Sequence, residues 1–305
     1  MLDAKHKSSY SQGMNKLPDE KRIQILSMLV EGSSMRSISR VVGVSINTVT
    51  KLLAEAGEAC LAYHDEKVKG LNCKRVQCDE IWAFCYAKEK NVHTAKSAPT
   101  FAGDVWTWTS ICADTKLICN WFVGGRDAEF GKLFMDDLAA RLNSRVQMTT
   151  DGHKVYLQAI EGAFGAEIDY AQLVKMFGAA PESAKGRYSP ANCTGIKKTA
   201  KIGDPDEKHI STSYAERQNL TMRMSMRRFT RLTNAFSKKF ESHCHALALY
   251  FVYYNFVRIH KSLKVSPAMA AGLTDKLWGF EDVIALIDAA QSEPKKRGPY
   301  KKKSA

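Results

Sequence analysis

The chain has 305 residues, a hydrophobic fraction of 45% and a formal net charge of +13. This length allows two or three domains, and the composition is that of a globular protein with a buried core. No stretch approaches the roughly 18 apolar residues of a membrane helix, and the polar first thirty residues do not resemble a signal peptide. We therefore expect a cytoplasmic protein without a membrane partner. Its eight cysteines, which include no Cys-x-x-Cys pair, are expected to be reduced and mostly buried.

The positive charge is concentrated in the second half of the chain. Residues 171–240 contain 14 basic and 5 acidic residues, whereas residues 71–170 are slightly acidic. This distribution favours binding to a polyanion such as nucleic acid, although some basic proteins bind nothing acidic. The Lys-rich end of the chain predicts a disordered basic arm. Its Arg297-Gly298-Pro299 segment either enters an A·T minor groove or only adds charge.

Residues 18–56 predict three short helices separated by Gly32 and Gly43 and ended by Gly57. Ser34 and Ser45 are suitable N-caps for the second and third helices. A helix, a glycine turn and a second helix resemble the helix-turn-helix segments of resolvase and transposase families. The alternative is a three-helix unit that only packs against the rest of the protein. In a DNA-binding unit, the major groove would be contacted by the polar side chains of Ser45, Asn47, Thr48 and Lys51.

From about residue 74 the sequence predicts a mixed α/β domain. Strands are expected over 76–86, 105–111, 117–123, 146–150 and 168–174, with helices over 127–142 and 154–164. Three consecutive strands followed by helix, strand, helix and strand are the order of an RNase H-like mixed sheet with flanking helices.

The remainder divides into less regular parts. Residues 181–212 predict an extended, mobile basic insertion, followed by a helix near 214–227. A long amphipathic helix is expected next, with Leu232, Phe236 and Phe240 at its start. We thus expect an all-α helix-turn-helix domain over 1–70, an RNase H-like core over 71–272, and a C-terminal helix with a basic tail over 273–305.

Two aspartates are candidate ligands of divalent metal ions. Asp79 lies within an otherwise apolar strand, where an unpaired charge costs several kcal/mol. Its neighbour Glu80 competes for this role, because adjacent strand residues face opposite sides and only one is expected to join the cluster. Asp151 follows a strand and precedes Gly152, which fits either a ligand site or a simple Asp-Gly turn. His153 either supports the metal site or is only a polar residue of the next helical turn.

Glu216 is the third acidic candidate. Ser213-x-x-Glu216 also fits a capping box, in which the carboxylate would bond the backbone of Ser213. Asn219, Arg223 and Arg227 follow at helical spacing on the expected face of Glu216. Arginines behind a carboxylate suit a site that binds both metal and DNA phosphate.

The motifs around these acids resemble those of a known enzyme family. Cys-Asp-Glu-Ile-Trp at 78–82, Thr-Asp-Gly-His at 150–153 and Tyr-Ala-Glu-Arg-Gln-Asn at 214–219 are similar to the catalytic motifs of bacterial insertion-sequence transposases. The resemblance is greatest to the Is-one family, that of the first insertion sequence described. It covers roughly residues 20–272 and includes Tyr254-Asn255 to Ser266-Pro267, which resembles the end of integrase-like cores. The 65 residues between Asp151 and Glu216 exceed the spacing in many integrase-like enzymes, which leaves the role of the insertion open.

The resemblance implies a DDE-type DNA transposase whose catalytic, metal-binding acids are Asp79, Asp151 and Glu216. It would use two Mg²⁺ or Mn²⁺ ions to cleave element ends and transfer them to target DNA. Arg223 and Arg227 would contact DNA, and His153 and Asn219 would lie beside the metal ligands. The implied partners are double-stranded DNA and further copies of the chain, at a bacterial nucleoid. The competing hypothesis is a non-catalytic DNA-binding regulator derived from such an enzyme, and a third is an RNase H-like nuclease without strand transfer.

Overall fold

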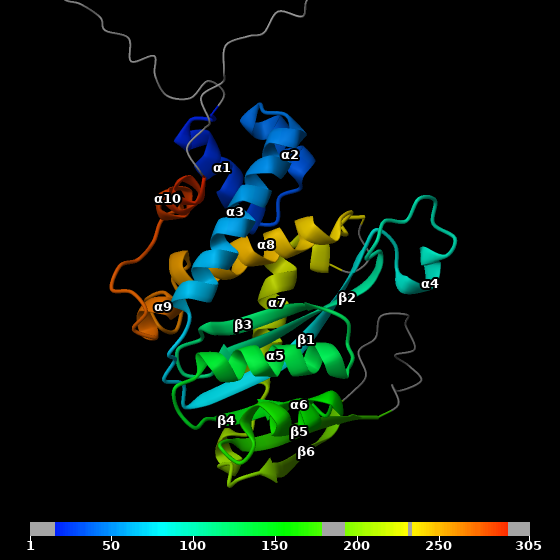
Figure 1. Ribbon diagram of the computed structural model, residues 1–305, viewed down its shortest axis with the longest axis vertical. Coiled ribbons are helices and arrows are strands. Elements are labelled where there is room, and N and C mark those ends of the chain that lie inside the picture. Colours follow the sequence, from blue (N-terminus) through cyan, green and yellow to red (C-terminus); the bar gives the residue numbers. More distant parts are fainter. Residues whose placement is uncertain (1–15, 179–192, 231–233, 292–305) are drawn as a thin grey trace, which may run out of the picture.

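The computed structural model describes residues 16–178, 193–230 and 234–291. A six-stranded mixed sheet forms its centre, in the order β3-β2-β1-β4-β5-β6 (Figure 1). The strands are β1 (Arg75–Cys85), β2 (Gly103–Cys112), β3 (Ile118–Gly124), β4 (Gln147–Thr150), β5 (Asp169–Phe177) and β6 (Cys193–Ile202). Strands β1 to β3 form an antiparallel meander, β4 and β5 run parallel to β1, and β6 is antiparallel to β5. The expected mixed sheet with flanking helices is confirmed.

Helices cover both faces of this sheet. On one face, α5 (Ala128–Arg141) packs on β2 and β3 and against α6 (Val155–Phe164). Trp108 of β2 contacts Tyr156 of α6 in the shared core. On the other face, α7 (Ser213–Ser225) and α8 (Phe240–Val252) enclose a second core around Ile81 (Figure 1). Because both faces are covered, most β1 side chains are buried. A charged residue on either face of β1 therefore lies in a largely apolar environment.

The N-terminal helices are α1 (Asp19–Val30), α2 (Met35–Val42) and α3 (Ile46–Lys67). Ser34 and Ser45 cap α2 and α3 as predicted, each accepting a hydrogen bond from a backbone N–H three residues on. The turn between these helices uses Gly43 at φ 70°, a left-handed conformation that suits glycine. All three helices share one hydrophobic core with the sheet.

The prediction that Gly57 ends the third helix is wrong. Helix α3 continues to Lys67 and packs along α8. A Cβ atom at Gly57 would lie 2.4 Å from the Cβ of His245, so glycine is needed here for close helix packing. The residue that suggests a helix end in the sequence is instead a contact point between two helices.

The expected insertion at 181–212 is partly wrong as well. Residues 179–192 lie outside the described part of the chain, but Cys193–Ile202 form β6, which pairs with β5 along its length. A 3₁₀ turn, η2 (Glu207–His209), then leads into α7. Lysines at 197, 198 and 201 gave this strand the composition of a loop. Such lysines are common on exposed edge strands, where they discourage pairing with other chains.

Two helix boundaries also differ from expectation. Helix α7 ends at Ser225, because Met226 is extended at φ −130° and ψ 105°. Arg227 therefore belongs to a separate 3₁₀ turn, η3 (Arg227–Phe229), and does not share the helical face of Glu216. Helix α8 begins only at Phe240; Phe236 precedes it and stacks on Phe84 at 4.7 Å, while Leu232 is not among the described residues.

The C-terminal part closes over the N-terminal helices. A π-helical turn, η4 (Tyr253–Val257), continues α8 and is followed by α9 (Pro267–Ala270) and α10 (Phe280–Ala290). Helix α10 packs on α1 and α3, and Arg22 of α1 forms an ion pair of 2.8 Å with Asp288. The predicted basic arm with Arg297 lies beyond the described residues. Within the described ranges, no helix is both long and apolar enough to cross a membrane.

Candidate metal centre

Three carboxylates meet where β4 ends beside β1. One ligand oxygen each from Asp79, Glu80 and Asp151 lies within 4.8 Å of the others. The pairing of β1 with β4 stops at Gln77 and Thr149, so no strand covers this edge of β1 at the next residues. Asp151 directly follows β4 and lies at the resulting opening. The topology thus brings together acids that are 71 residues apart in the sequence.

The expectation that only one of Asp79 and Glu80 joins the cluster is wrong. The two side chains do face opposite sides of the sheet, as the strand period requires: Asp79 bonds Asn219 of α7, whereas Glu80 lies near Arg126 and His153. Both nevertheless reach Asp151, because the missing neighbour strand leaves room around the sheet edge.

Asp79 is held by two hydrogen bonds. Its Oδ2 accepts a bond of 2.8 Å from the Asn219 side-chain amide, and its Oδ1 accepts one of 2.9 Å from the backbone N–H of Glu80. Burial, together with the negative charges of Asp151 and Glu216, raises the pKa of Asp79 to about 6. A cation at this position would relieve the repulsion.

Glu80 is more deeply buried, with 8% of its surface exposed. Its Oε1 lies 3.4 Å from Nε of Arg126 and 3.7 Å from Nδ1 of His153. Its Oε2 has no hydrogen-bond partner among the described residues, nor does Nδ1 of His153. Burial, followed by the charge of Asp151, raises the pKa of Glu80 to about 7, while burial lowers that of His153. His153 therefore stays neutral near pH 7 and does not balance the carboxylates.

Asp151 fits both interpretations given by the sequence. Its Oδ1 accepts a bond of 2.9 Å from the backbone N–H of His153, as in an Asp-Gly turn. Its Oδ2 remains near the cluster, 4.0 Å from Nη2 of Arg126. The guanidinium of Arg126 stacks on Trp106 at 4.4 Å and so stays beside Glu80 and Asp151.

Glu216 is near this cluster but is not one of its three members. Both of its carboxylate oxygens accept hydrogen bonds from Nζ of Lys175, at 2.6 and 2.5 Å. The hydroxyl of Thr212 donates a further bond of 2.7 Å to Oε1. No capping box forms, since the backbone N–H of Ser213 instead donates to the hydroxyl of Ser211. The carboxylate thus bonds Lys175 and the side chain of the N-cap residue Thr212, and not the backbone N–H of Ser213.

Gln77 positions the helix turn that carries Glu216. Its side-chain oxygen accepts hydrogen bonds from the backbone N–H groups of Tyr214 and Ala215, at 2.8 and 3.2 Å. These bonds fix the first turn of α7 over β1, two residues before Asp79. Sequence reasoning missed the roles of Gln77, Lys175 and Arg126. Only Gln77 gave a signal, as a polar side chain on an apolar strand next to the acidic motif.

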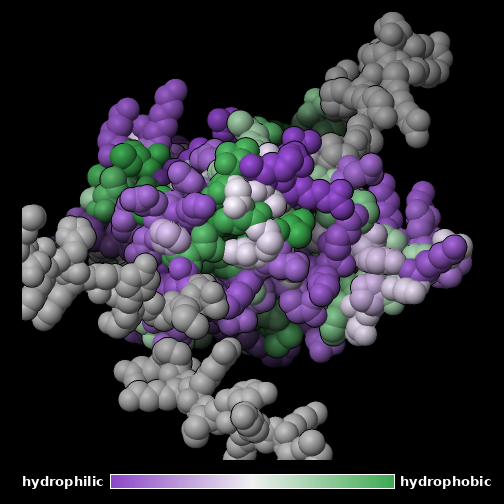
Figure 2. Space-filling view, turned by 90° about the horizontal axis from the view of Figure 1, so that it is seen from above, coloured by the Kyte–Doolittle hydropathy of each residue, from purple (hydrophilic) through white to green (hydrophobic). Residues whose placement is uncertain are grey.

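The predicted DNA-facing residues lie at the start of α3. Asn47 is exposed, and the side chain of Lys51 is 77% exposed, 3.6 Å from Glu55. Ser45 caps the helix, and its hydroxyl lies 2.9 Å from that of Thr48. Figure 2 shows that hydrophilic side chains predominate at the end of the molecule that carries α1 to α3, with hydrophobic areas between them. These positions are far in sequence from the carboxylate cluster.

Comparisons with known proteins gave only distant likenesses. No family model and no curated protein matches the sequence. The piggyBac transposase, solved as a synaptic complex with hairpin DNA, aligns with 93% of this chain and 74% of its own, at 10% identity and a TM-score of 0.34. The Mos1 mariner paired-end complex with Mn aligns with 52% of this chain and 59% of its own, at 12% identity and a TM-score of 0.21. At these scores the likeness is weak, and the role of the site is inferred from its geometry.

Proposed function

We propose that this chain is a DDE-type DNA transposase that binds the ends of a DNA element, cleaves them and joins them to target DNA. The observation that carries this proposal is the meeting of Asp79, Glu80 and Asp151 at one sheet edge, with the helix of Glu216 fixed over the same strand. Two-metal phosphoryl transfer requires acidic side chains around a pair of ions. An RNase H-like sheet would supply them from its first strand, the end of its fourth strand and a later helix.

The residues present fit divalent cations. Glu80 Oε2 is buried without a partner, and Asp79 and Glu80 both have raised pKa values caused mainly by burial. Carboxylate oxygens are the ligands that Mg²⁺ and Mn²⁺ prefer. Asp79, Asp151 and Glu216 would hold two such ions, with Glu80 as a fourth ligand. The ions would activate the attacking hydroxyl and stabilise the leaving oxygen.

The chain's own residues would prepare this site. Asn219 holds the carboxylate of Asp79, and Arg126 lies between Glu80 and Asp151. Lys175 would release Glu216 to a metal ion and then face the scissile phosphate, which an ammonium group can contact. The strand order supports an RNase H-like core, because the meander β3-β2-β1 continues through parallel β4 and β5.

The DNA partner would be recognised outside the carboxylate cluster. We infer that α2 and α3 act as a helix-turn-helix, with Asn47, Thr48 and Lys51 towards the major groove and the cap residue Ser45 at its edge. Arg223 and Arg227 would contact phosphates nearer the core. Because enzymes of this kind usually bring two DNA ends together, we also propose a homodimer or larger assembly on DNA, at the bacterial nucleoid.

One observation favours a second candidate function. Lys175 neutralises Glu216 and keeps it out of the three-acid cluster, which suits a non-catalytic DNA-binding regulator. The transposase and the regulator are distinguished by incubating the full chain with DNA that contains both element ends and their genomic flanks. The transposase predicts nicks at the ends with Mg²⁺ or Mn²⁺ and none with a chelator. End binding with no nicks under either condition indicates the regulator.

A further inference from the structure

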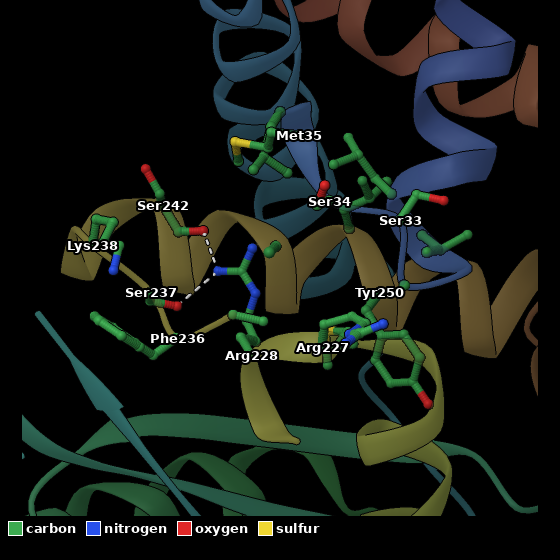
Figure 3. A pocket seen from close by; sticks show the side chains of 18 of the residues that line it. Ser33, Ser34, Met35, Arg227, Arg228, Phe236, Ser237, Lys238, Ser242 and Tyr250 are labelled. Atoms are coloured by element: carbon green, nitrogen blue, oxygen red, sulfur yellow. Dashed lines mark hydrogen bonds between the residues drawn. The ribbon is translucent and has the colours of Figure 1, made fainter. Parts of the chain in front are cut away.

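A large cavity lies apart from the carboxylates, at the junction of the N-terminal helices and the core. Its volume is about 890 Å³, within the range of ligand-binding sites. The loop between α1 and α2 forms one wall, η3 and the segment before α8 form another, and α8 forms the floor (Figure 3). Of the residues that line it, the proposed function assigns a role to Arg227 alone.

The lining is strongly cationic. Arg227, Arg228, Lys238 and Lys239 contribute positive charge. Among the described lining residues the one acid is Glu31, whose carboxylate accepts a hydrogen bond of 3.0 Å from Tyr253. Five serine hydroxyls add hydrogen-bonding groups. In Figure 3, Arg227 and Arg228 approach the cavity from η3, while Ser33 and Ser34 face it from the opposite wall. Cations and hydroxyls around one space suit a phosphate group.

Arg228 is the most informative of these side chains. It donates hydrogen bonds of 3.0 Å to the hydroxyl of Ser237 and to the carbonyl of Ser242, which leaves further guanidinium N–H groups available. Over residues 16–178, 193–230 and 234–291, no carboxylate forms an ion pair with it. Burial lowers its pKa to about 10, so it remains charged at neutral pH. A half-buried charge without a counter-charge is costly, and an anion in the cavity would offset this cost.

Leu29 of α1, Leu53 of α3 and Leu249 of α8 also line the cavity and give it an apolar wall. A cavity that offers both cations and aliphatic carbons matches a nucleotide unit, which has a phosphate and a less polar sugar. The cavity also lies beside α3, which would bind DNA under the proposed function. A strand leaving α3 would therefore meet it before the core.

We propose that this cavity binds a phosphodiester of the DNA strand held by α3, with the phosphate on Arg227 and Arg228 and the sugar against the apolar wall. This inference rests on the proposed function only in taking DNA as the partner. Its consequence is that DNA bridges the N-terminal helices and the core.

Binding of a fluorescent duplex of the element end, measured without metal ions over a range of NaCl concentrations, tests the proposal. Arg227→Gln combined with Lys238→Gln should weaken binding roughly tenfold and lower the slope of log affinity against log salt by about 1 to 2. The control, Lys69→Gln with Lys132→Gln, removes the same charge outside the lining. Equal losses of affinity and slope in the two variants would overturn the proposal.

A second measurement does not depend on removing charge. A cysteine introduced as Ser33→Cys should react with a thiol reagent in the free protein and become protected when the duplex is bound, as followed by peptide mass spectrometry. Unchanged labelling at saturating DNA would contradict occupation of the cavity. Because neither measurement needs cleavage, a wild-type protein that binds in this way but never nicks DNA would refute the proposed function alone. A protein that nicks DNA but shows neither the specific loss of affinity nor the protection of the cysteine would refute only this inference.

Discussion

At the scale of single residues, the acidic pair on β1 is the feature that most constrains function. Asp79 is half-buried and Glu80 is buried, on opposite faces of the sheet, yet both have oxygens in the cluster with Asp151. Among the described residues, Arg126 is the only arginine or lysine that forms an ion pair with Glu80 or Asp151. The lowered pKa of His153 disfavours its charged form. The uncompensated negative charge should make the protein sensitive to both pH and divalent ions.

Without divalent ions, we expect the free energy of unfolding to fall as the pH rises from about 4 to about 7. The folded-state pKa values of Asp79 and Glu80, about 6 and 7, exceed their ordinary values. Between these pH values the native state therefore binds more protons than the unfolded state. The stability that protonated Asp79 and Glu80 contribute at low pH is consequently lost as the pH rises. Mg²⁺ should raise the melting temperature more at pH 8 than at pH 5. Thermal melts with Mg²⁺ or with EDTA measure the change in melting temperature. Glu80→Gln should weaken its pH dependence. Equal Mg²⁺ effects at the two pH values would contradict the prediction.

Lys175 tests whether Glu216 is a metal ligand. If it is, Mg²⁺ must displace the ammonium group, so Lys175→Met should raise Mg²⁺ affinity several-fold and Glu216→Gln should lower it about tenfold. In the Glu216→Gln background, the lysine substitution should then have little further effect. Titration calorimetry on the four proteins of this cycle gives the coupling. An affinity unchanged by Glu216→Gln would remove Glu216 from the site.

At the scale of elements, the packing of α3 on α8 connects the N-terminal helices to the core. Gly57→Ala would place a Cβ 2.4 Å from that of His245, and we expect a loss of about 1–3 kcal/mol in unfolding free energy. Gly162→Ala on α6 is the matched control, because a Cβ there meets nothing within 4 Å and alanine favours a helix. Denaturant unfolding compares the two. A Gly57→Ala protein as stable as wild type would contradict the close packing.

The start of α3 carries the DNA-recognition hypothesis. Asn47→Ala with Lys51→Ala should weaken binding to element ends about tenfold or more, since both side chains are exposed. Nicking of a pre-opened substrate at high enzyme concentration should be less affected, because recognition and chemistry use different elements. Parallel gel-shift and nicking assays measure the two effects. Loss of nicking without loss of binding would mean that α3 only supports the core.

Elements with a strong hydrophobic period were predictable from sequence. Strands β1 to β5 and helices α5 and α6 lie within a few residues of their expected ranges, and the serine caps of α2 and α3 form as predicted. Strand β6 was not predictable, because it is an exposed edge strand whose lysines interrupt the hydrophobic pattern. Gly57 misled because a glycine that permits close packing looks like one that ends a helix.

The sequence predicted two acidic residues of the candidate site, but it did not predict which side chains contact them. Asp79 and Asp151 were identified from polar residues at unusual places on strands, and the structure brings them together. The participation of Glu80 depends on β4 ending at Thr150 beside β1, which is a property of strand register. The contact of Lys175 with Glu216 likewise arises only when β5 and α7 meet. Such pairings depend on tertiary structure and leave no local sequence signal.

At the scale of the whole molecule, one chain carries the N-terminal helices proposed to bind DNA, the cationic cavity and the acidic centre. Two basic regions, η3 and the segment before α8, lie between the N-terminal helices and the sheet. A DNA strand that follows these regions would run from α3 to the carboxylate cluster. The central claim is that the acidic centre cleaves this DNA with divalent metal ions.

Asp151→Asn tests that claim most directly. The change keeps the size of the side chain and its hydrogen bond to the backbone of His153, but it removes a charge needed to hold a metal ion. Wild-type and variant proteins are compared on the same element-end DNA, at one salt concentration, by gel shift and by nicking with Mg²⁺. The account predicts that the variant binds DNA at least as tightly and nicks it slower by several orders of magnitude. Undiminished nicking by the variant would contradict it.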